Sequence, residues 1–204
     1  QTAMHEAIID DIAAEYPSAV WESDDSVGGI ASSELTRNAF ISVLIACAAM
    51  LIYIWFRFEF LSGVAALVAL VHDVAIMSAV VLILGVQVNS AFIAAILTIV
   101  GYSINDTIVV FDRIRENGRR MKGSLRGKLV DKSISETIVR SLNTSITTLF
   151  TITALYIFGV TSIKEFALPL IVGILSGTYS SIFIAAPFWV WIHKLDDNRK
   201  KKYK

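Results

Sequence analysis

The chain has 204 residues, of which 55% are hydrophobic and only 18% are charged, and its mean hydropathy is +0.64. Soluble domains carry about a quarter charged residues, so this composition excludes an ordinary soluble domain and favours a membrane protein. The net charge of zero conceals an asymmetry, because residues 1–36 contain eight Asp or Glu and no Lys or Arg. The rest of the chain carries an excess of eight positive charges.

Residues 1–36 are interpreted as the end of an external domain. Apolar residues at four-residue spacing predict a helix over Ala3–Tyr16, and a strand at Ala19–Trp21 is expected after the proline that ends it. Such a short α+β piece buries little core alone, so it is expected to be the remnant of a larger domain. The acidic start has no signal-peptide pattern, which favours an additional membrane span upstream of Gln1.

Residues 37–193 are predicted to form an all-α, polytopic transmembrane domain. A helix needs roughly 20 apolar residues to cross a bilayer, and five segments meet that length. The predicted spans are residues 38–58, 61–84, 90–111, 138–159 and 166–192. In the fifth, Gly173 and Gly177 form a GxxxG pair, which permits close helix packing within the chain.

The charges outside the spans predict the orientation. The loop 112–136 holds eight Lys or Arg against four acidic residues, and the tail that begins near residue 194 adds six basic residues. Positively charged segments remain in the cytoplasm, so both are expected there, with the acidic N-terminal segment outside. Anionic lipid headgroups explain the basic loop without any nucleic acid or other partner.

Asp106 lies inside the third predicted span, where an unpaired carboxylate costs about 2.5–3.5 kcal/mol or more. Arg140 starts the fourth span, and Thr144, Thr147, Thr148 and Thr151 follow it on one helix face. A nearby arginine favours the ionised acid, whereas burial favours the neutral acid, so the pair is a candidate proton switch. A static ion pair, with the hydroxyls bonded to their own backbone, is the alternative.

A second polar site is predicted around His72 and Asp73, with Asn105 as a further candidate member. Asp73 lies near the middle of its span and has no partner one turn away on its own helix. A proton relay and a structural hydrogen bond to Ser or Thr on another helix are both compatible with this position.

Five stretches of the chain together resemble one family. They are "ELTRNAF", "YIWFRFEF", "VHD", "GYSINDTIVVFDRIREN" and "RSLNTSITT", in this order. Together they resemble SecF, or the SecF-like half of fused SecDF proteins. These proteins are accessories of the Sec translocon and are related to the resistance-nodulation-division transporters. The resemblance implies a six-helix bundle, of which this chain holds five helices.

The resemblance also implies a function. SecF-type proteins act with SecD and the SecYEG translocon in the bacterial cytoplasmic membrane, where the proton motive force drives late export of unfolded preproteins. The family's proton-relay aspartate matches Asp106, and its arginine and threonine four residues apart match Arg140 and Thr144. The family's usual "VGP" turn is replaced by Val27-Gly28-Gly29, which leaves the local turn geometry open.

Two other functions stay open: a proton-coupled exporter of small solutes, and a purely structural partner of SecD. Enzymatic activity is not expected, because no phosphate-binding loop, metal-spaced His and Cys set or nucleophile elbow is present in the sequence. No cofactor is expected other than the proton as coupling ion.

Overall fold

The computed structural model describes residues 12, 14–16, 29–121 and 125–202, with the backbone alone at 29–33, 35–36 and 197–202. The chain divides into two units, Gln1–Glu34 and Leu35–Lys204, and the second contains the bundle described below. Residues 12, 14 and 15 are helical, as predicted. The strand at 19–21 and the rest of the first helix lie outside the described residues, so the α+β remnant stays a prediction.

All the long elements in the described part of the chain are helices. In chain order they are α2 (Gly29–Arg57), α3 (Phe60–Ile83), α4 (Ser90–Arg120), α5 (Arg126–Phe158), α6 (Thr161–Ser180), the π-helical turn η1 (Ser181–Ala185) and α7 (Ala186–Lys202). Five stretches of helix are long and apolar enough to cross a membrane: Arg37–Arg57, Phe60–Ile83, Ser90–Arg120, Arg126–Phe158 and Thr161–Asp196. The five predicted spans are therefore confirmed, and the chain is a multi-pass membrane protein.

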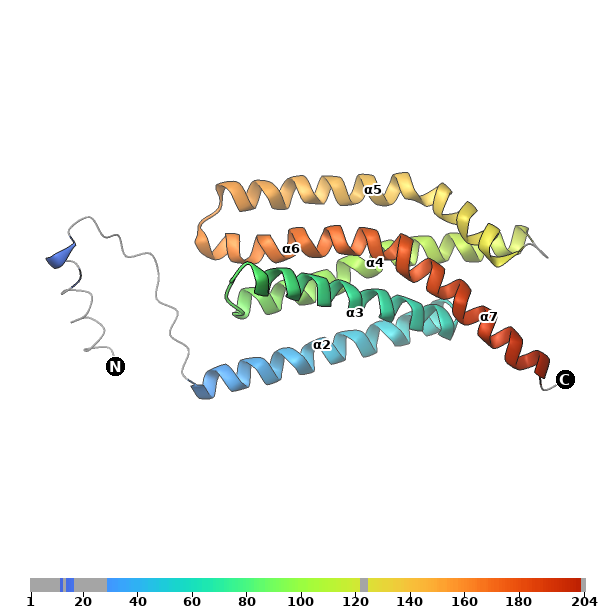
Figure 1. Ribbon diagram of the computed structural model, residues 1–204, viewed down its shortest axis with the longest axis horizontal. Coiled ribbons are helices and arrows are strands. Elements are labelled where there is room, and N and C mark those ends of the chain that lie inside the picture. The colour runs from blue at the N-terminus through green and yellow to red at the C-terminus, as the bar shows by residue number, and fades with distance from the viewer. Residues whose placement is uncertain (1–11, 13, 17–28, 122–124, 203–204) are drawn as a thin grey trace. The chain divides into compact units, whose positions relative to one another are not determined.

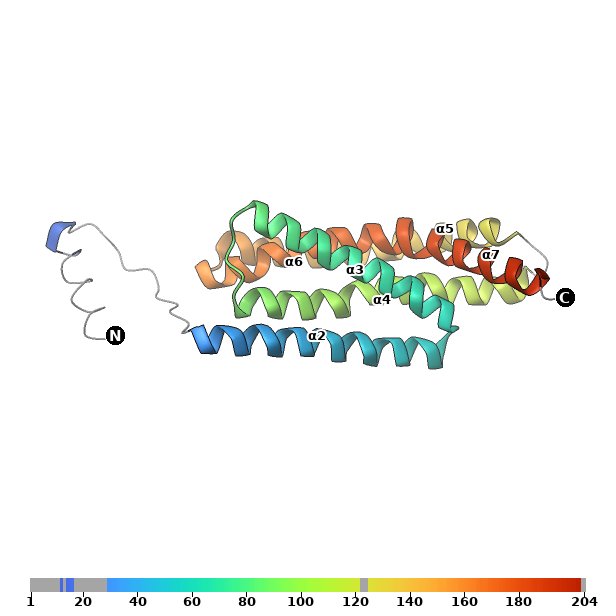
Figure 2. The ribbon, with the colours of Figure 1, turned by 60° about the horizontal axis from the view of Figure 1, so that its bottom comes forward.

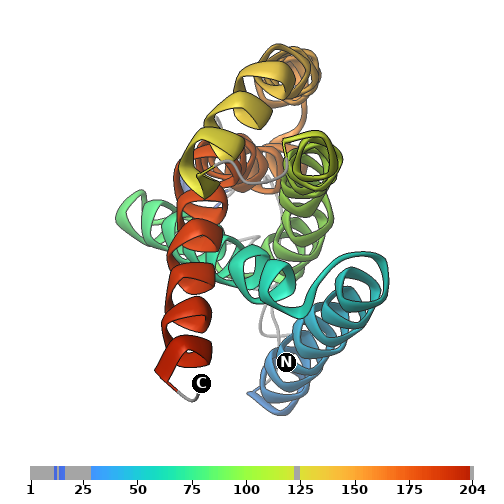
Figure 3. The same ribbon diagram turned by 90° about the vertical axis from the view of Figure 1, so that its right-hand side faces the viewer.

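Helix α6 is the central element of the bundle. It packs against α3, α4 and α5, which run alongside it in both side views (Figures 1 and 2). Viewed along the bundle, α2 and α5 lie at opposite edges (Figure 3). Both edge helices expose large apolar side chains, among them Ile45, Trp55, Phe150 and Phe158. Lipid, or another apolar surface in the membrane, is the environment that suits these faces.

The connection between α3 and α4 is short because two residues fix its ends. Gly85 turns the chain with φ of 69°, a conformation that favours glycine. Asn89 then caps α4 by accepting a hydrogen bond from the backbone N–H of Phe92, at 3.1 Å. The residues between the second and third predicted spans thus form a tight, capped connection.

The segment 112–136, which the sequence presented as a loop, is largely helical. Helix α4 continues to Arg120, and α5 already begins at Arg126. Glu116 forms ion pairs with Arg113 at 2.5 Å and Arg120 at 2.7 Å, at the offsets of three and four that support a helix. Charge limits how long a helix stays in lipid, but it does not end the helix.

The fifth span is longer than predicted and is interrupted. It begins at Thr161 rather than Phe166, runs through α6 and η1, and ends in α7 at Asp196. Helix α7 itself continues to Lys202, so the described part of the predicted tail is helical. Helix α7 leaves α6 at an angle near η1 (Figure 1). A π-helical turn adds a residue to one turn of helix and is a known cause of such bends.

The Gly173–Gly177 pair lies where α6 meets α4. A Cβ atom on Gly173 would lie 2.5 Å from Cγ1 of Ile99, and one on Gly177 would lie 3.1 Å from Cβ of Ser103. The distance at Gly173 is shorter than real contacts allow and the one at Gly177 is tighter than most, so the close approach of the two helices requires glycine at 173 and favours it at 177. The predicted packing role within the chain is confirmed.

We expect Gly173→Ala to lower the free energy of unfolding by about 1–3 kcal/mol, because the new methyl group overpacks the α4–α6 contact. Gly101→Ala is the matched control, since a Cβ there meets no atom within 4 Å. Thermal unfolding of the two variants in detergent measures the difference. Equal stability of both variants would contradict the assigned packing role.

Candidate functional site

A polar layer crosses the middle of the bundle between two apolar clusters. One cluster lies around Met77, Ile99 and Ile174, and the other contains Ala66 and Phe111. On α3, α4 and α6 the residues between the two clusters are polar or small. They include Asp73 on α3, Ser103 and Asp106 on α4, and Ser176, Gly177 and Ser180 on α6.

Asp73 is the most enclosed carboxylate of this layer, with 0% of the residue exposed. Its Oδ2 accepts hydrogen bonds from the hydroxyl groups of Ser103 at 2.5 Å and Ser180 at 2.6 Å, and its Oδ1 accepts one from Ser176 at 2.8 Å. The partners come from α4 and α6, so the carboxylate connects three helices. The structural hydrogen bond to serine on another helix, one of the two predicted roles of Asp73, is therefore present. The other role, a proton relay, is not tested by this geometry.

His72 and Asn105, the other members predicted for this second site, are placed differently. Nδ1 of His72 lies 3.2 Å from Oδ1 of Asp73, and its half-buried ring is tilted toward that of Tyr179. Asn105 is exposed and makes no side-chain hydrogen bond with any described residue. Only His72 therefore joins Asp73.

Asp106 is nearly as buried, at 3% exposure, but it has far fewer partners. The hydroxyl group of Ser145 on α5 lies 3.4 Å from its Oδ2, a long hydrogen bond. Thr178 on α6 lies 2.6 Å from the oxygen of Ser145. Because Thr178 also reaches the carbonyl of Ile174 at 2.8 Å, its one hydroxyl proton has two alternative acceptors.

Asp106 and Arg140 form no ion pair among the described residues, so the static ion pair given as the alternative is not formed, while the proton switch stays a prediction. Arg140 is exposed and makes no ion pair with any described residue, although its charge acts on Asp106 through space. The reason is helical geometry: Arg140 and Ser145 are five positions apart, which turns their side chains about 140° away from each other. Ser145, the residue that contacts Asp106, was not among the predicted site residues.

The threonine stripe does not face Asp106 either. Thr144, Thr147 and Thr151 donate to backbone carbonyl groups of their own helix, at 2.9–3.2 Å, which is the alternative stated for them. The buried face of α5 is instead a second stripe with a strict spacing of four. It consists of Ser133, Thr137, Ser141 and Ser145. This regular spacing of small hydroxyl residues is the feature of the sequence from which the buried face of α5 could have been predicted.

Arg140 faces a polar cavity of about 460 Å³ between α2, α4 and α5. Five other charged residues line it: Arg57, Asp112, Arg113, Glu116 and Glu136. Arg113 and Glu136 form an ion pair at 2.6 Å that joins α4 to α5. This cavity places a group of charged side chains beside Arg140, near the middle of α5.

The two carboxylates are suited to different chemistry. Asp73 has three hydroxyl donors in place, so a change in its charge would disturb bonds to two other helices. Asp106 has one weak partner, and a hydroxyl group can donate to a carboxylate or accept from a carboxylic acid. A change in the protonation state of Asp106 would therefore not break a dense set of hydrogen bonds, as it would at Asp73. Among the described residues, no group of three or more His, Cys, Asp and Glu is placed to hold a metal ion.

Comparisons with known proteins agree on one family. The family model described as "Protein export membrane protein SecD/SecF, C-terminal" matches residues 8–195. Protein translocase subunit SecF of Petrotoga mobilis is 44% identical over 183 residues, which are 90% of this chain and 60% of that protein. Protein translocase subunit SecDF of Thermus thermophilus is 45% identical over 174 residues, 85% of this chain and 24% of that protein.

Solved structures give the same result. The crystal structure of SecDF from Thermus thermophilus, described as a translocon-associated membrane protein, superposes with a TM-score of 0.86 and 41% identity. The match covers 93% of this chain and 26% of that one. This chain thus spans about 60% of the Petrotoga SecF and a quarter of the fused SecDF.

We expect Asp73→Leu to lower the free energy of unfolding by about 2 kcal/mol or more, because it leaves three buried hydroxyl groups without their acceptor. Asp73→Asn keeps one carbonyl oxygen and should cost less. Asp106→Asn is the matched control on a carboxylate of similar burial with a single long contact. Thermal unfolding in detergent ranks the three variants, and an equal loss for Asp106→Asn would contradict the assigned difference.

Proposed function

This chain belongs to the SecD/SecF C-terminal family of protein export membrane proteins, and on that premise we propose that it acts as the SecF-type part of a Sec translocase accessory. In this role it uses the proton motive force to promote late export and release of preproteins on the outer side of the membrane. It acts with SecD, as a separate chain or as the other half of a fusion, and with the SecYEG translocon. It is not an enzyme, and the proton is its coupling ion.

The observation that carries this proposal is the environment of Asp106. A carboxylate in the membrane core is costly unless it is paired or hydrogen-bonded. Asp106 is 3% exposed, and Ser145 is its one hydrogen-bond partner among the described residues, at 3.4 Å. A residue that served only to hold helices together would be expected to have the dense bonding of Asp73. Asp106 is instead arranged so that a proton can be added or removed.

Arg140 links the protonation state of Asp106 to the packing of the helices. When Asp106 is ionised, Arg140 attracts it across the α4–α5 contact, and protonation removes that attraction. Helix α5 lies at the edge of the bundle, so a change in this attraction shifts α5 against α4 and α6. The movement passes to the external part of the protein, which handles the preprotein. Thr144, one turn after Arg140, belongs to the same moving segment of α5.

The proposal also includes the location and orientation of the protein in the membrane. The protein lies in the bacterial cytoplasmic membrane, with residues 1–36 outside and the C-terminal end in the cytoplasm. The basic ends of α4, α5 and α7 support this orientation through the positive-inside rule. The polar cavity near Arg140 then opens toward the cytoplasm.

A purely structural partner of SecD is the second candidate, because the hydrogen-bond partner of Asp106 among the described residues is Ser145 and Arg140 makes no direct contact with it. In that case the charges of the two residues have no role in coupling. The two candidates differ in what happens when both charges are removed together.

We expect Asp106→Asn to reduce proton-stimulated export to the level seen without a proton motive force, because asparagine has no titrating proton. The measurement is preprotein export in proteoliposomes that contain the full-length protein with SecD and SecYEG. Asp112→Asn is the matched control, since Asp112 is on the same helix, exposed and paired with Arg57 at 3.2 Å. Normal stimulation of an assembled Asp106→Asn complex would remove the proton role.

We expect the double variant Asp106→Leu with Arg140→Met to assemble with SecD but to lose proton-stimulated export. Apolar residues can replace a structural charge pair without harm to folding, so this variant separates assembly from coupling. Copurification with SecD measures assembly, and the same proteoliposome assay measures coupling. Full export activity in the double variant would establish the structural candidate instead.

A further inference from the structure

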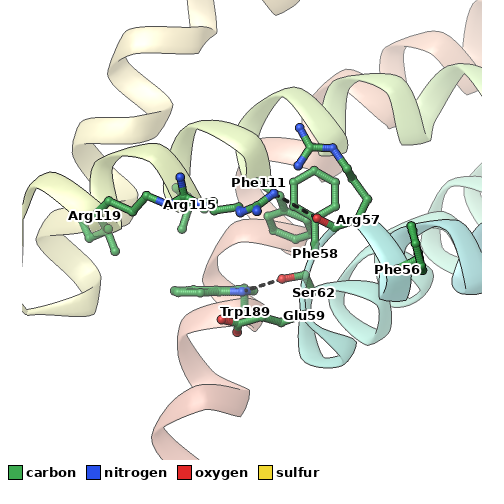
Figure 4. Close-up of a pocket in the computed structure, with 12 residues that line it drawn as sticks. Phe56, Arg57, Phe58, Glu59, Ser62, Phe111, Arg115, Arg119 and Trp189 are labelled. Carbon is green, nitrogen blue, oxygen red and sulfur yellow. Dashed lines mark hydrogen bonds between the residues drawn. The ribbon is translucent and has the colours of Figure 1, made fainter.

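A second cavity, of about 620 Å³, lies away from both carboxylates at one end of the bundle. It is enclosed by the end of α2, the start of α3, the last turns of α4, the start of α5 and Trp189 of α7 (Figure 4). The apolar spans of α2 and α3 meet here at Arg57 and Phe60. The cavity therefore lies where the hydrocarbon core gives way to the headgroup region.

One wall of the cavity is aromatic. It is formed by Phe56, Phe58, Phe111 and Trp189. Trp189 is buried and held in place by a hydrogen bond from its Nε1 to the hydroxyl group of Ser62 at 3.0 Å. Phe56, by contrast, is 95% exposed and lies at the edge. Aromatic side chains in this position suit the apolar part of an amphiphile near the membrane interface.

The other wall is basic, and two of its three arginines keep their charge unpaired. Arg57 pairs with Asp112 at 3.2 Å. Arg115 donates to the carbonyl oxygen of Arg57 at 3.0 Å, a neutral acceptor. Arg119 forms no ion pair with any residue in the described part of the chain, and its guanidinium group extends along the cavity beside that of Arg115 (Figure 4).

The nearby acids are directed to other partners. Glu59 lines the cavity, and its Oε2 lies 3.0 Å from Nε2 of the buried His193. Glu116 is engaged by Arg113 and Arg120. The cavity thus combines an apolar aromatic wall with two guanidinium groups that form no ion pair with any described residue. Guanidinium groups bind phosphate in a bidentate manner, so the basic wall suits a phosphate group.

We infer that this cavity binds an anionic phospholipid, with the headgroup phosphate at Arg115 and Arg119 and the start of an acyl chain against the aromatic wall. The position at the end of the apolar spans favours a lipid over a free anion, because a lipid alone presents phosphate and hydrocarbon together at that depth. Basic pockets between membrane helices are known to hold such headgroups. This inference does not depend on the proton role of Asp106.

The test is to titrate diphosphatidylglycerol onto the full-length protein in detergent and to count bound lipid by native mass spectrometry. Phosphatidylcholine and inorganic phosphate are the comparison ligands. We expect Arg115→Gln with Arg119→Gln to weaken diphosphatidylglycerol binding about tenfold to thirtyfold, the loss typical of two basic residues at an anionic lipid surface. Lys128→Gln with Lys194→Gln removes the same charge from exposed positions outside the cavity and should leave binding unchanged.

A third variant tests the cavity itself without changing any charge. Gly118 lines the cavity, and a Cβ there would lie at an ordinary 3.8 Å from Cδ2 of Leu129, so Gly118→Leu should fold and fill the space. We expect it to weaken binding as much as the arginine pair. Unchanged binding in Gly118→Leu, an equal loss in the lysine control, or equal binding of inorganic phosphate would each overturn the inference.

Discussion

The carboxylate of Asp73 is the interaction on which the bundle depends. In a membrane there is no water to satisfy a buried acid, so every bond must come from protein. Ser103 from α4 and Ser176 and Ser180 from α6 supply those bonds at 2.5–2.8 Å. The short distances require α3, α4 and α6 to approach closely, and Gly177 permits it by leaving room for Ser103. Small residues and a single acid thereby hold three helices in one arrangement.

Helix α5 is held by a different kind of contact from the one at Asp73. Apart from Val130, its fully buried residues all carry hydroxyl groups, and the Oγ of one of them, Ser141, has no hydrogen-bond partner among the described residues. Hydroxyl groups can exchange partners at little cost, whereas interlocked apolar side chains cannot. In the proposed mechanism α5 is therefore the helix that shifts, while the Asp73 cluster stays intact.

The number of spans was predictable from the sequence, whereas the ends of the helices and the contacts of the buried acids were not fully predictable. Hydropathy alone predicted five spans, because lipid imposes a length on each. It could not predict where α4 and α5 end, since the ion pairs of Glu116 continue the helix beyond the membrane. The sequence identified Asp106 and Asp73 as unusual and anticipated a serine or threonine on another helix for Asp73, but it did not identify Ser145 as the partner of Asp106. Arg140 was chosen for its charge, whereas the four-residue spacing of Ser133, Thr137, Ser141 and Ser145 determines which face of α5 meets α4.

Helix α6 connects the two carboxylates through residues that point in two directions. Ser176 and Ser180, four positions apart, reach Asp73, and Thr178 between them reaches Ser145 and so Asp106. The same short stretch therefore contacts both the Asp73 cluster and α5. The π-helical turn at Ser181–Ala185 follows directly, and it is the point where α7 bends away. In the proposed mechanism, a shift of α5 that breaks the Thr178–Ser145 contact would act on α6 one turn before this bend, and so would link the site near Asp106 to α7.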